Sequence, residues 1–285
     1  MSLAILGSGS AGNCSLLTLN TSADEAVHVL IDAGLSPRET ACRLGAFSRS
    51  IDDISDILVT HFDTDHFHPG WRAKLQTAAI SVHAHRRHRN PAGRAMLPRG
   101  VLHLYDDGPA LSRSAATSIE SLLLAHDDLG TVGFVIEHGG ARLGFATDLG
   151  RVPLSLHERF VNLDALALES NYDGPMQAGS ARPAFLKRRI MGGAGHLSNE
   201  QALDAVRSIA SRSALQHIAL LHLSRQCNCP RLVRSLYEAH ARHLLDRLTI
   251  TTQHQPTSQL RIVAARTRAP DVQQITQPGQ QHALF

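Results

Sequence analysis

Cysteine and aromatic residues are scarce in this chain of 285 residues. It contains 4 cysteines and 1 tryptophan, and aromatic residues make up 4% of it. Cys14, Cys42, Cys227 and Cys229 are too few and too scattered for a disulfide framework, and the last two lack the second pair that a zinc knuckle needs. We therefore expect reduced thiols, as in a cytoplasmic protein.

Long apolar runs and a strong excess of one charge are also missing. No run of ~18 apolar residues indicates a membrane span. The first ten residues, MSLAILGSGS, lack the basic start and the apolar stretch of a secretory signal. The net charge of +3 does not by itself indicate nucleic-acid binding. We expect a cytoplasmic globular protein without a membrane partner.

Short strand-like runs separated by turn residues make up most of the chain. Strands are predicted at 3–6, 14–19, 27–32, 54–60 and 80–85, and again at 119–126, 132–138, 141–148, 164–170, 217–224 and 247–252. Helices are predicted at 36–45, 69–77, 183–192, 199–212 and 230–244. Two groups of strands, each followed by helices, predict an α+β fold: an αββα sandwich of two mixed β-sheets flanked by helices.

A doubly wound parallel sheet is the competing architecture. Gly7, Gly9 and Gly12, with Asp32 about twenty residues on, formally match a dinucleotide-binding pattern. That pattern requires a helix whose N-terminus faces the pyrophosphate. A strand-like run follows Gly12 instead, so we reject the dinucleotide interpretation.

The last twenty residues differ in composition from the rest. Residues 266–285 are polar and rich in Gln and Pro, which predicts a catalytic domain over 1–265 and a flexible tail over 266–285. The tail ends in QHALF, similar to the short peptides that dock bacterial repair proteins on the DNA polymerase sliding clamp. Leu284 and Phe285 offer two apolar anchors and Gln281 a hydrogen-bonding group. The alternatives are a chance apolar terminus or one that packs back on the domain.

Histidine, in contrast, is abundant, with 18 residues. Several histidines and aspartates directly follow predicted strands: His61, Asp63, Asp65, His66, His126, Asp148 and His222. Such a set suffices for two divalent ions ~3.5–4 Å apart that share a carboxylate and a water. The alternative for any one of these histidines is a satisfied packing residue. The segment HAHRRHRN at 83–90 is expected to lie on a solvated basic face.

Seven short motifs resemble the YycJ/WalJ-like branch of the metallo-β-lactamase fold. They are SGSAGNC (8–14), LIDAG (30–34), HDDLGTVGF (126–134), TDLG (147–150), LESNYD (168–173), LKRRIMGGAGHLSN (186–199) and LLHLS (220–224). The resemblance covers about residues 2–232 and implies an αββα nuclease that degrades duplex DNA from a 5′ end. It also implies that His61, Asp63 and His126 hold one metal ion, that Asp65, His66 and His222 hold the other, and that Asp148 bridges them.

Asp63 departs from the family, in which most members have histidine at this position. A carboxylate is a harder ligand than imidazole, so we expect a shift from zinc toward manganese or iron. Two dications bound by three carboxylates have a net charge of +1, whereas two dications bound by two carboxylates have a net charge of +2. A less positive centre stabilises hydroxide less, so the pKa of the water that bridges the two ions falls by a smaller amount. We favour an altered but working centre over a decayed one.

His196 and Glu169 are candidate catalytic residues, together with the candidate ligand Asp65. His196 resembles the histidine that the related tRNase Z branch uses as a proton donor. Glu169 would raise the pKa of His196 and fix its tautomer. The alternative is that Glu169 pairs with an arginine and His196 merely caps a loop.

Substrate phosphates also need contacts. The amides of 7–13 could form an anion-binding concavity, with Ser8, Ser10 and Asn13 as candidate contacts. Lys187, Arg188 and Arg189 are candidate cationic contacts, although such a triplet is more often a solvated helix face. The same applies to RRHR at 86–89.

Three functions remain open from the sequence. The leading hypothesis is a two-metal 5′-3′ exonuclease on double-stranded DNA in replication or repair, with manganese, iron or zinc as cofactor. A small-molecule phosphodiesterase of the same fold is the second, and a non-catalytic metal-binding module is the third. Residue chemistry alone indicates a metal-dependent hydrolase of a phosphoester.

Overall fold

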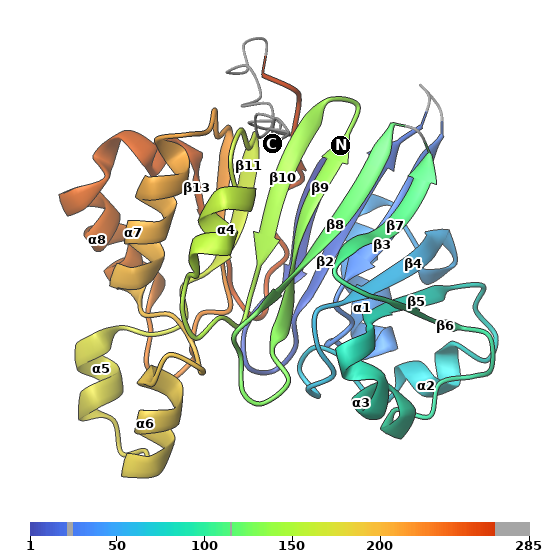
Figure 1. Cartoon of the computed structure of the whole chain (residues 1–285), viewed down its shortest axis with the longest axis horizontal. Helices are drawn as coiled ribbons and strands as arrows, with labels where there is room; N and C mark the ends of the chain where they lie inside the picture. Colours follow the sequence, from blue (N-terminus) through green and yellow to red (C-terminus); the bar gives the residue numbers. More distant parts are fainter. Residues whose placement is uncertain (22–24, 115, 266–285) are drawn as a thin grey trace, which may run out of the picture.

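In the computed structural model, the described residues (1–21, 25–114 and 116–265) form two seven-stranded sheets that face each other (Figure 1). The first sheet, in the order in which its strands pair, contains β14 (Leu260–Arg261), β1 (Ser2–Gly7), β2 (Cys14–Asn20), β3 (Ala26–Ile31), β4 (Ile54–Val59), β5 (Ser81–His85) and β6 (Leu102–Tyr105). The second contains β13 (Leu248–Ile250), β12 (His217–Leu221), β11 (Ala165–Glu169), β10 (Ala141–Ala146), β9 (Thr131–His138), β8 (Thr117–Leu124) and β7 (Gly108–Ser114).

Both sheets are mixed. In the first, β1, β2 and β3 pair antiparallel, whereas β3 to β6 pair parallel. In the second, β7 to β10 pair antiparallel and β10 to β13 pair parallel. The antiparallel pairing of β1 with β2 excludes a doubly wound parallel sheet, and with it the dinucleotide-binding alternative.

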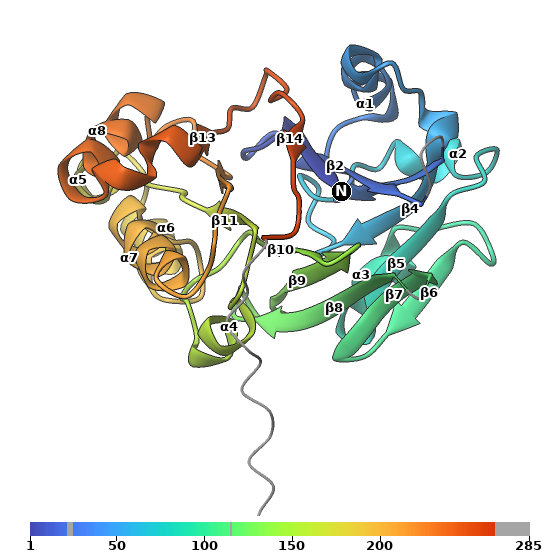
Figure 2. The ribbon, with the colours of Figure 1, turned by 90° about the horizontal axis from the view of Figure 1, so that it is seen from above.

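Helices cover the outer face of each sheet (Figure 2). Those associated with the first sheet are α1 (Pro37–Leu44), α2 (Trp71–Lys74) and α3 (Arg89–Arg94). Those associated with the second are α4 (Leu154–Arg159), α5 (Gly174–Gly179), α6 (Ala184–Met191), α7 (Asn199–Ala210) and α8 (Pro230–His240). The predicted αββα sandwich is confirmed. None of the helices in the described part of the chain is long and apolar enough to cross a bilayer.

Three apolar layers hold this arrangement together. Leu17 and Ile31 of the first sheet meet Phe134 and Phe145 of the second between the sheets. The outer layers pack α4, α7 and α8 on the second sheet, and Trp71 of α2 with its neighbours on the first. Burial of apolar side chains on both faces explains why the central strands are almost continuously hydrophobic.

Most predicted elements are present, with differences at their ends. Ser36 caps α1 by accepting a hydrogen bond from the Glu39 amide. The helix predicted at 69–77 is only one turn long, and the one predicted at 230–244 ends at His240 and continues as the 3₁₀ segment Arg242–Arg247. Strands β6 and β14 and helices α3, α4 and α5 were not predicted, because short elements carry too little periodicity to be recognised. Strand β7 was not predicted either; it has seven residues, but it contains Pro109 and no clear apolar alternation.

The expectation of a solvated basic face at 83–90 is wrong for the histidines. His83, His85 and His88 are buried, whereas Arg86, Arg87, Arg89 and Asn90 are exposed. A 2.7 Å hydrogen bond joins His83 Nε2 to the carboxylate Oδ1 of buried Asp56, which accepts it. The predicted tail at 266–285, with its clamp-binding candidates, lies outside the described residues, so the division into domain and tail stays a prediction.

Candidate metal centre

Strand ends from both sheets bring the predicted ligands together. His61 follows β4 of the first sheet, whereas His126, Asp148 and His222 follow β8, β10 and β12 of the second. Asp148 and His222 have φ values of 56° and 55°, in the left-handed region that non-glycine residues rarely adopt. Such strain is found where the surrounding structure fixes a side chain for function. Here it turns two side chains off their strands into one site.

His61, Asp63 and His126 form the first group. Each offers one ligand atom, and these atoms lie within 4.8 Å of one another. The two histidines are buried, whereas the Asp63 side chain is 62% exposed and lies 3.9 Å from His61, Oδ2 to Nε2. Asp63 thus lies at the solvent side of the cluster.

Asp65, His66 and His222 form the second group, again within 4.8 Å. Asp65 Oδ2 lies 3.8 Å from His66 Nε2 and 3.5 Å from His222 Nε2. His66 and His222 are buried. The two groups match the two ligand sets that the family resemblance implies; that these side chains bind metal stays a prediction.

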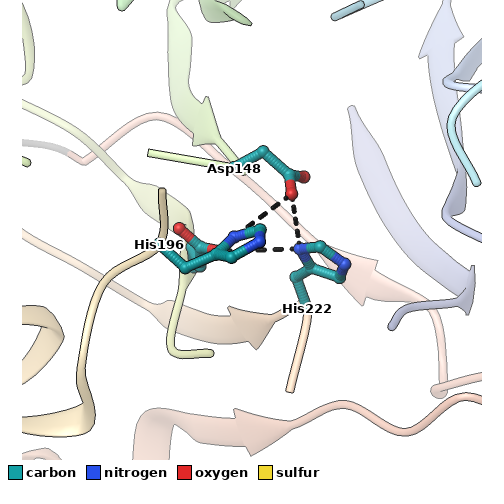
Figure 3. Close-up of side chains that lie close together, drawn as sticks. Asp148, His196 and His222 are labelled. Carbon is teal, nitrogen blue, oxygen red and sulfur yellow. Dashed lines mark hydrogen bonds and ion pairs between the residues drawn. The ribbon is translucent and has the colours of Figure 1, made fainter. Parts of the chain in front are cut away.

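Asp148 lies beside the second group, and Figure 3 shows its carboxylate pointing toward His222 and His196. Its Oδ2 is 2.8 Å from His66 Nε2, and its Oδ1 is 2.7 Å from His222 Nδ1. It also forms a possible ligand cluster with His61 and His66. A buried carboxylate in this position is suited to bridge two cations.

His196 approaches the centre from the loop between α6 and α7. Its Nδ1 is 2.7 Å from Glu169 Oε1. The same atom is 3.4 Å from Asp148 Oδ1, a contact drawn in Figure 3. The short contact to buried Glu169 favours a proton on Nδ1 and leaves Nε2 available. Asp148, Glu169, His196 and His222 also form a fourth group with metal-ligand spacing, so His196 has a possible ligand role beside that of proton donor.

The donor set fits divalent cations. The site combines buried imidazoles with carboxylates. Both ring nitrogens of His222 lack a well-directed hydrogen bond, although Nδ1 lies close to Asp148. Buried polar atoms without a directed partner are uncommon in proteins and are often explained by an ion. Mixed nitrogen and oxygen donors suit zinc, iron and manganese.

A family model described as the β-lactamase superfamily domain matches residues 28–218. The chain belongs to this superfamily. Exodeoxyribonuclease YycJ of Bacillus anthracis is 28% identical over 232 residues, which are 81% of this chain and 85% of that protein. Exodeoxyribonuclease WalJ of Streptococcus pneumoniae is 28% identical over 233 residues, or 80% and 83% of the two chains. The resemblance to the YycJ/WalJ-like branch is confirmed as a distant homology over most of the chain.

Solved structures agree on the superfamily fold. The metallo-β-lactamase fold protein YhfI of Bacillus subtilis has a TM-score of 0.65 at 14% identity and covers 90% of this chain and 98% of its own. Zinc-bound PqqB of Methylobacterium extorquens has a TM-score of 0.64 at 18% identity, with coverage of 90% and 99%. Human tRNase Z, short form, has a TM-score of 0.60 at 16% identity, with coverage of 90% and 99%.

Electrostatics in this superfamily site follow from burial and from carboxylate–imidazole contacts. Burial lowers the pKa of His66 and His222, but neighbouring carboxylates, Asp148 foremost, outweigh it and raise both pKa values well above the ordinary range. Burial and the nearby His66 lower the pKa of His61 well below that range. Burial and the Asp65 carboxylate raise the pKa of Asp63. A bound cation would offset both effects on Asp63.

A second layer of contacts orients the candidate ligands. Asp32 Oδ2 lies 2.7 Å from His66 Nδ1, which leaves Nε2 facing the site. Asp32 also accepts hydrogen bonds from the amide and the hydroxyl of Thr60, and the Gly195 carbonyl lies 3.0 Å from His126 Nδ1. Partners of this kind fix the ring orientation of metal-binding histidines. This role of Asp32 was not predicted, although Asp32 belongs to the motif LIDAG, because it depends on a contact with a histidine far away in the sequence.

The loop 7–13 does not form the expected anion-binding concavity. The amides of Ser8, Gly9, Ala11, Gly12 and Asn13 all donate within the protein. The buried Ser8 hydroxyl accepts a hydrogen bond from the His222 amide, and the buried Asn13 side chain contacts Asp65 and His66. These side chains therefore support the candidate ligands. Ser10 is exposed beside the site and stays a candidate contact.

The predicted basic triplet lies on α6. Lys187 Nζ donates to the Ala178 carbonyl, and Arg189 forms an ion pair with Asp127, so these two cations are partly engaged. Arg188 is exposed and lines the cleft. Their contact with a substrate stays a prediction.

Two adjoining pockets open onto the centre. One, of about 420 Å³, contains Asp65, Asp148, His196 and His222 in its lining. The other, of about 710 Å³, extends from His61 and His126 toward Arg94 of α3 and Arg188 of α6. Both include His61, Asp63 and Arg189. The site therefore lies in a cleft that continues beyond the ligands.

Proposed function

We propose that this superfamily member is a two-metal phosphodiester hydrolase that degrades double-stranded DNA from the 5′ end. The observation that carries the proposal is the seven-residue cluster, whose members lie in two groups joined by Asp148. The relatives named exodeoxyribonucleases, with homology over most of the chain, supply the substrate class.

One divalent ion would be held by His61, Asp63 and His126. The other would be held by Asp65, His66 and His222, and Asp148 would be a ligand of both. Divalent ions held by these residues would supply Lewis-acid activation of a water and charge neutralisation at the phosphodiester. Thr60 and Asp32 hold the imidazoles of His61 and His66 in place.

His196 would donate the proton that the leaving oxygen needs. The Glu169 carboxylate outweighs burial and raises the pKa of His196, which keeps the imidazole protonated to higher pH. Glu169 is itself fully buried, and burial raises its pKa, but the contact with His196 reverses this and lowers it. A proton donor works best when its pKa lies near the working pH.

The shape of the cleft favours a polymer over a small phosphodiester. A narrow closed pocket would suit a small molecule, whereas the larger pocket continues past the centre to α3. On the other side a third pocket, lined by Ser10, Arg182 and Arg225, adjoins the smaller one. Arginines along an open cleft are suited to contact successive phosphates. The small-molecule phosphodiesterase and the non-catalytic metal-binding module are the alternatives to be tested.

Labelled duplex DNA tests the proposal. Duplexes carrying a 5′ or a 3′ label are incubated with the chain and manganese, iron or zinc, and cyclic and linear dinucleotides serve as small phosphodiesters. We expect metal-dependent release of short products from the 5′ end. Hydrolysis of the dinucleotides alone would favour the small-molecule enzyme, and tight metal binding without any hydrolysis would favour the binding module.

Replacing Asp63 with histidine, the residue most family members have, is expected to preserve hydrolysis and to change its metal preference. Imidazole is a softer ligand than carboxylate, so activation should shift from manganese or iron toward zinc. The loss of one negative charge makes the centre more positive, so activity should also persist to lower pH. Rates across a pH series with each metal measure both shifts.

Asp128→His, an equivalent change in the same cleft outside the ligand groups, is the matched control. It should leave the metal preference unchanged. If Asp63→His has the same metal preference and pH profile as the natural chain, Asp63 is not a ligand.

Docking on the polymerase sliding clamp through Gln281, Leu284 and Phe285 remains part of the proposal, although the segment lies outside the described residues. The full chain is expected to bind purified clamp, and a Leu284→Ala, Phe285→Ala double variant is expected to lose that binding while hydrolysing short duplexes at the same rate. Equal clamp binding by the natural chain and the double variant would contradict docking through this segment.

A further inference from the structure

An apolar hollow lies beside the metal centre, on the side of α2 and α3. Its volume is about 340 Å³, and its walls include Phe62, Phe67, Pro91 and Met96, with Arg72 and Arg94 at its edge. The Phe62 and Phe67 rings lie 5.2 Å apart, centroid to centroid, and are tilted by 48°. Phe67 is buried, whereas Phe62 is partly exposed and Met96 is 57% exposed. Unlike the core, this surface has apolar groups open to a ligand.

The hollow adjoins the centre directly. Phe62 stands between the candidate ligands His61 and Asp63, so its Cα is about 3.8 Å from theirs. Phe62, Pro91 and Arg94 also line the larger pocket, which reaches His61, Asp63 and His126. A strand whose phosphodiester lies at the ligands therefore has a continuous path into the hollow.

The positive charge at the hollow favours an anionic ligand. Arg72 and Arg94 are exposed, no carboxylate lines the hollow, and neither arginine has an ion pair within the described part of the chain. Arg189, across the cleft, is in contrast paired with Asp127. An apolar cavity edged by two unpaired guanidinium groups matches a nucleobase flanked by phosphates, because aromatic rings stack on bases and arginines bind phosphates.

We propose that the hollow binds one unpaired nucleobase of the strand being cut, close to the scissile phosphodiester, with Arg72 and Arg94 on the adjoining phosphates. This rests on the proposed function and deepens it. A base held between Phe62 and Met96 has left its duplex, so the enzyme would act on an opened end. Mismatched or frayed ends would then be better substrates than fully paired ones.

An abasic scan locates the base. Hydrolysis-resistant phosphorothioate duplexes, unpaired over the first four nucleotides at the 5′ end, carry one abasic site at each position in turn, and affinity is measured by fluorescence anisotropy with manganese present. We expect the natural chain to lose about ten-fold in affinity at one position only, the size of a single stacking contact.

Two variants assign that position to the hollow. Phe62→Leu and Met96→Ser should each weaken binding of the intact strand and abolish the effect of the abasic site. Met96 is remote in sequence from the candidate ligands, which guards against an indirect effect of Phe62→Leu on metal binding. Phe185→Leu changes an exposed phenylalanine on α6 and should retain the full effect.

Arginine variants test the phosphate contacts. The double change Arg72→Ala, Arg94→Ala is expected to raise KM for duplex DNA about ten-fold with kcat within two-fold, because these residues bind the strand and do not react with it. Arg207→Ala, on the exposed face of α7, removes an equal side chain elsewhere and should leave KM unchanged.

The outcomes separate the two proposals. A position-specific abasic effect that Phe62→Leu and Met96→Ser abolish supports the base site, even if no DNA is hydrolysed, in which case the proposed nuclease activity fails alone. Equal loss at every position, or a position-specific loss that both variants retain, overturns the base site whether or not DNA is hydrolysed.

Discussion

Asp148→Ala is expected to lower metal-dependent hydrolysis of duplex DNA by about 10³-fold or more. Asp148 lies 2.8 Å from His66 and 2.7 Å from His222, both of the second group, and it also has metal-ligand spacing with His61 of the first. Removing it leaves two buried imidazoles without their shared acceptor and should weaken metal binding at both candidate sites. Lewis-acid stabilisation by bound metal contributes several kcal/mol, and 1.36 kcal/mol corresponds to a factor of ten in rate.

Rates and metal content are measured together for Asp148→Ala and for a matched control. Asp204→Ala removes an exposed carboxylate on α7 and should behave like the natural chain. Loss of activity with loss of bound metal agrees with a bridging role. An Asp148→Ala chain that binds two ions and retains a tenth or more of the activity would show that Asp148 is not the shared ligand.

The second large effect is expected at His196. His196→Ala should lower kcat by ~10²–10⁴-fold, the usual contribution of a general acid, while the chain still binds two ions. His240→Ala, on the exposed face of α8, is the control and should leave kcat unchanged. Because His196 also belongs to a group with metal-ligand spacing, loss of one ion in His196→Ala would instead make it a ligand.

Glu169→Gln distinguishes a proton donor from a merely structural histidine. The Glu169 carboxylate raises the pKa of His196, so its removal should lower that pKa. The donor is then deprotonated at lower pH, and the alkaline fall of kcat should move toward acidic pH. An alkaline limb that does not move would exclude His196 as the acid that this limb reports.

Much of the fold was predictable because long strands carry clear patterns. The apolar run 54–60 and the capped helix at Ser36 are present as expected, since burial and capping are encoded locally. The spatial convergence of His61, His126 and His222 followed only from the family resemblance and from their places after strands, because residue spacing does not give the order of strands in a sheet.

The features that were missed depend on tertiary contacts. Burial of His83 depends on its 2.7 Å contact with Asp56 of the neighbouring strand, which nothing in HAHRRHRN indicates. Loop 7–13 was expected to bind anions, but its amides are used by distant partners such as Thr252 and Gln253. Asp32 acts through a histidine that is 34 positions away in the sequence.

The most direct test of the two-metal hydrolase is a titration of metal into the metal-free chain, with bound metal and cleavage of labelled duplex DNA followed in the same samples. The proposed centre predicts two manganese or iron ions per chain and cleavage that reaches its plateau as the second ion binds. Cleavage that persists in a chelator, or a plateau with a single ion bound, would contradict it.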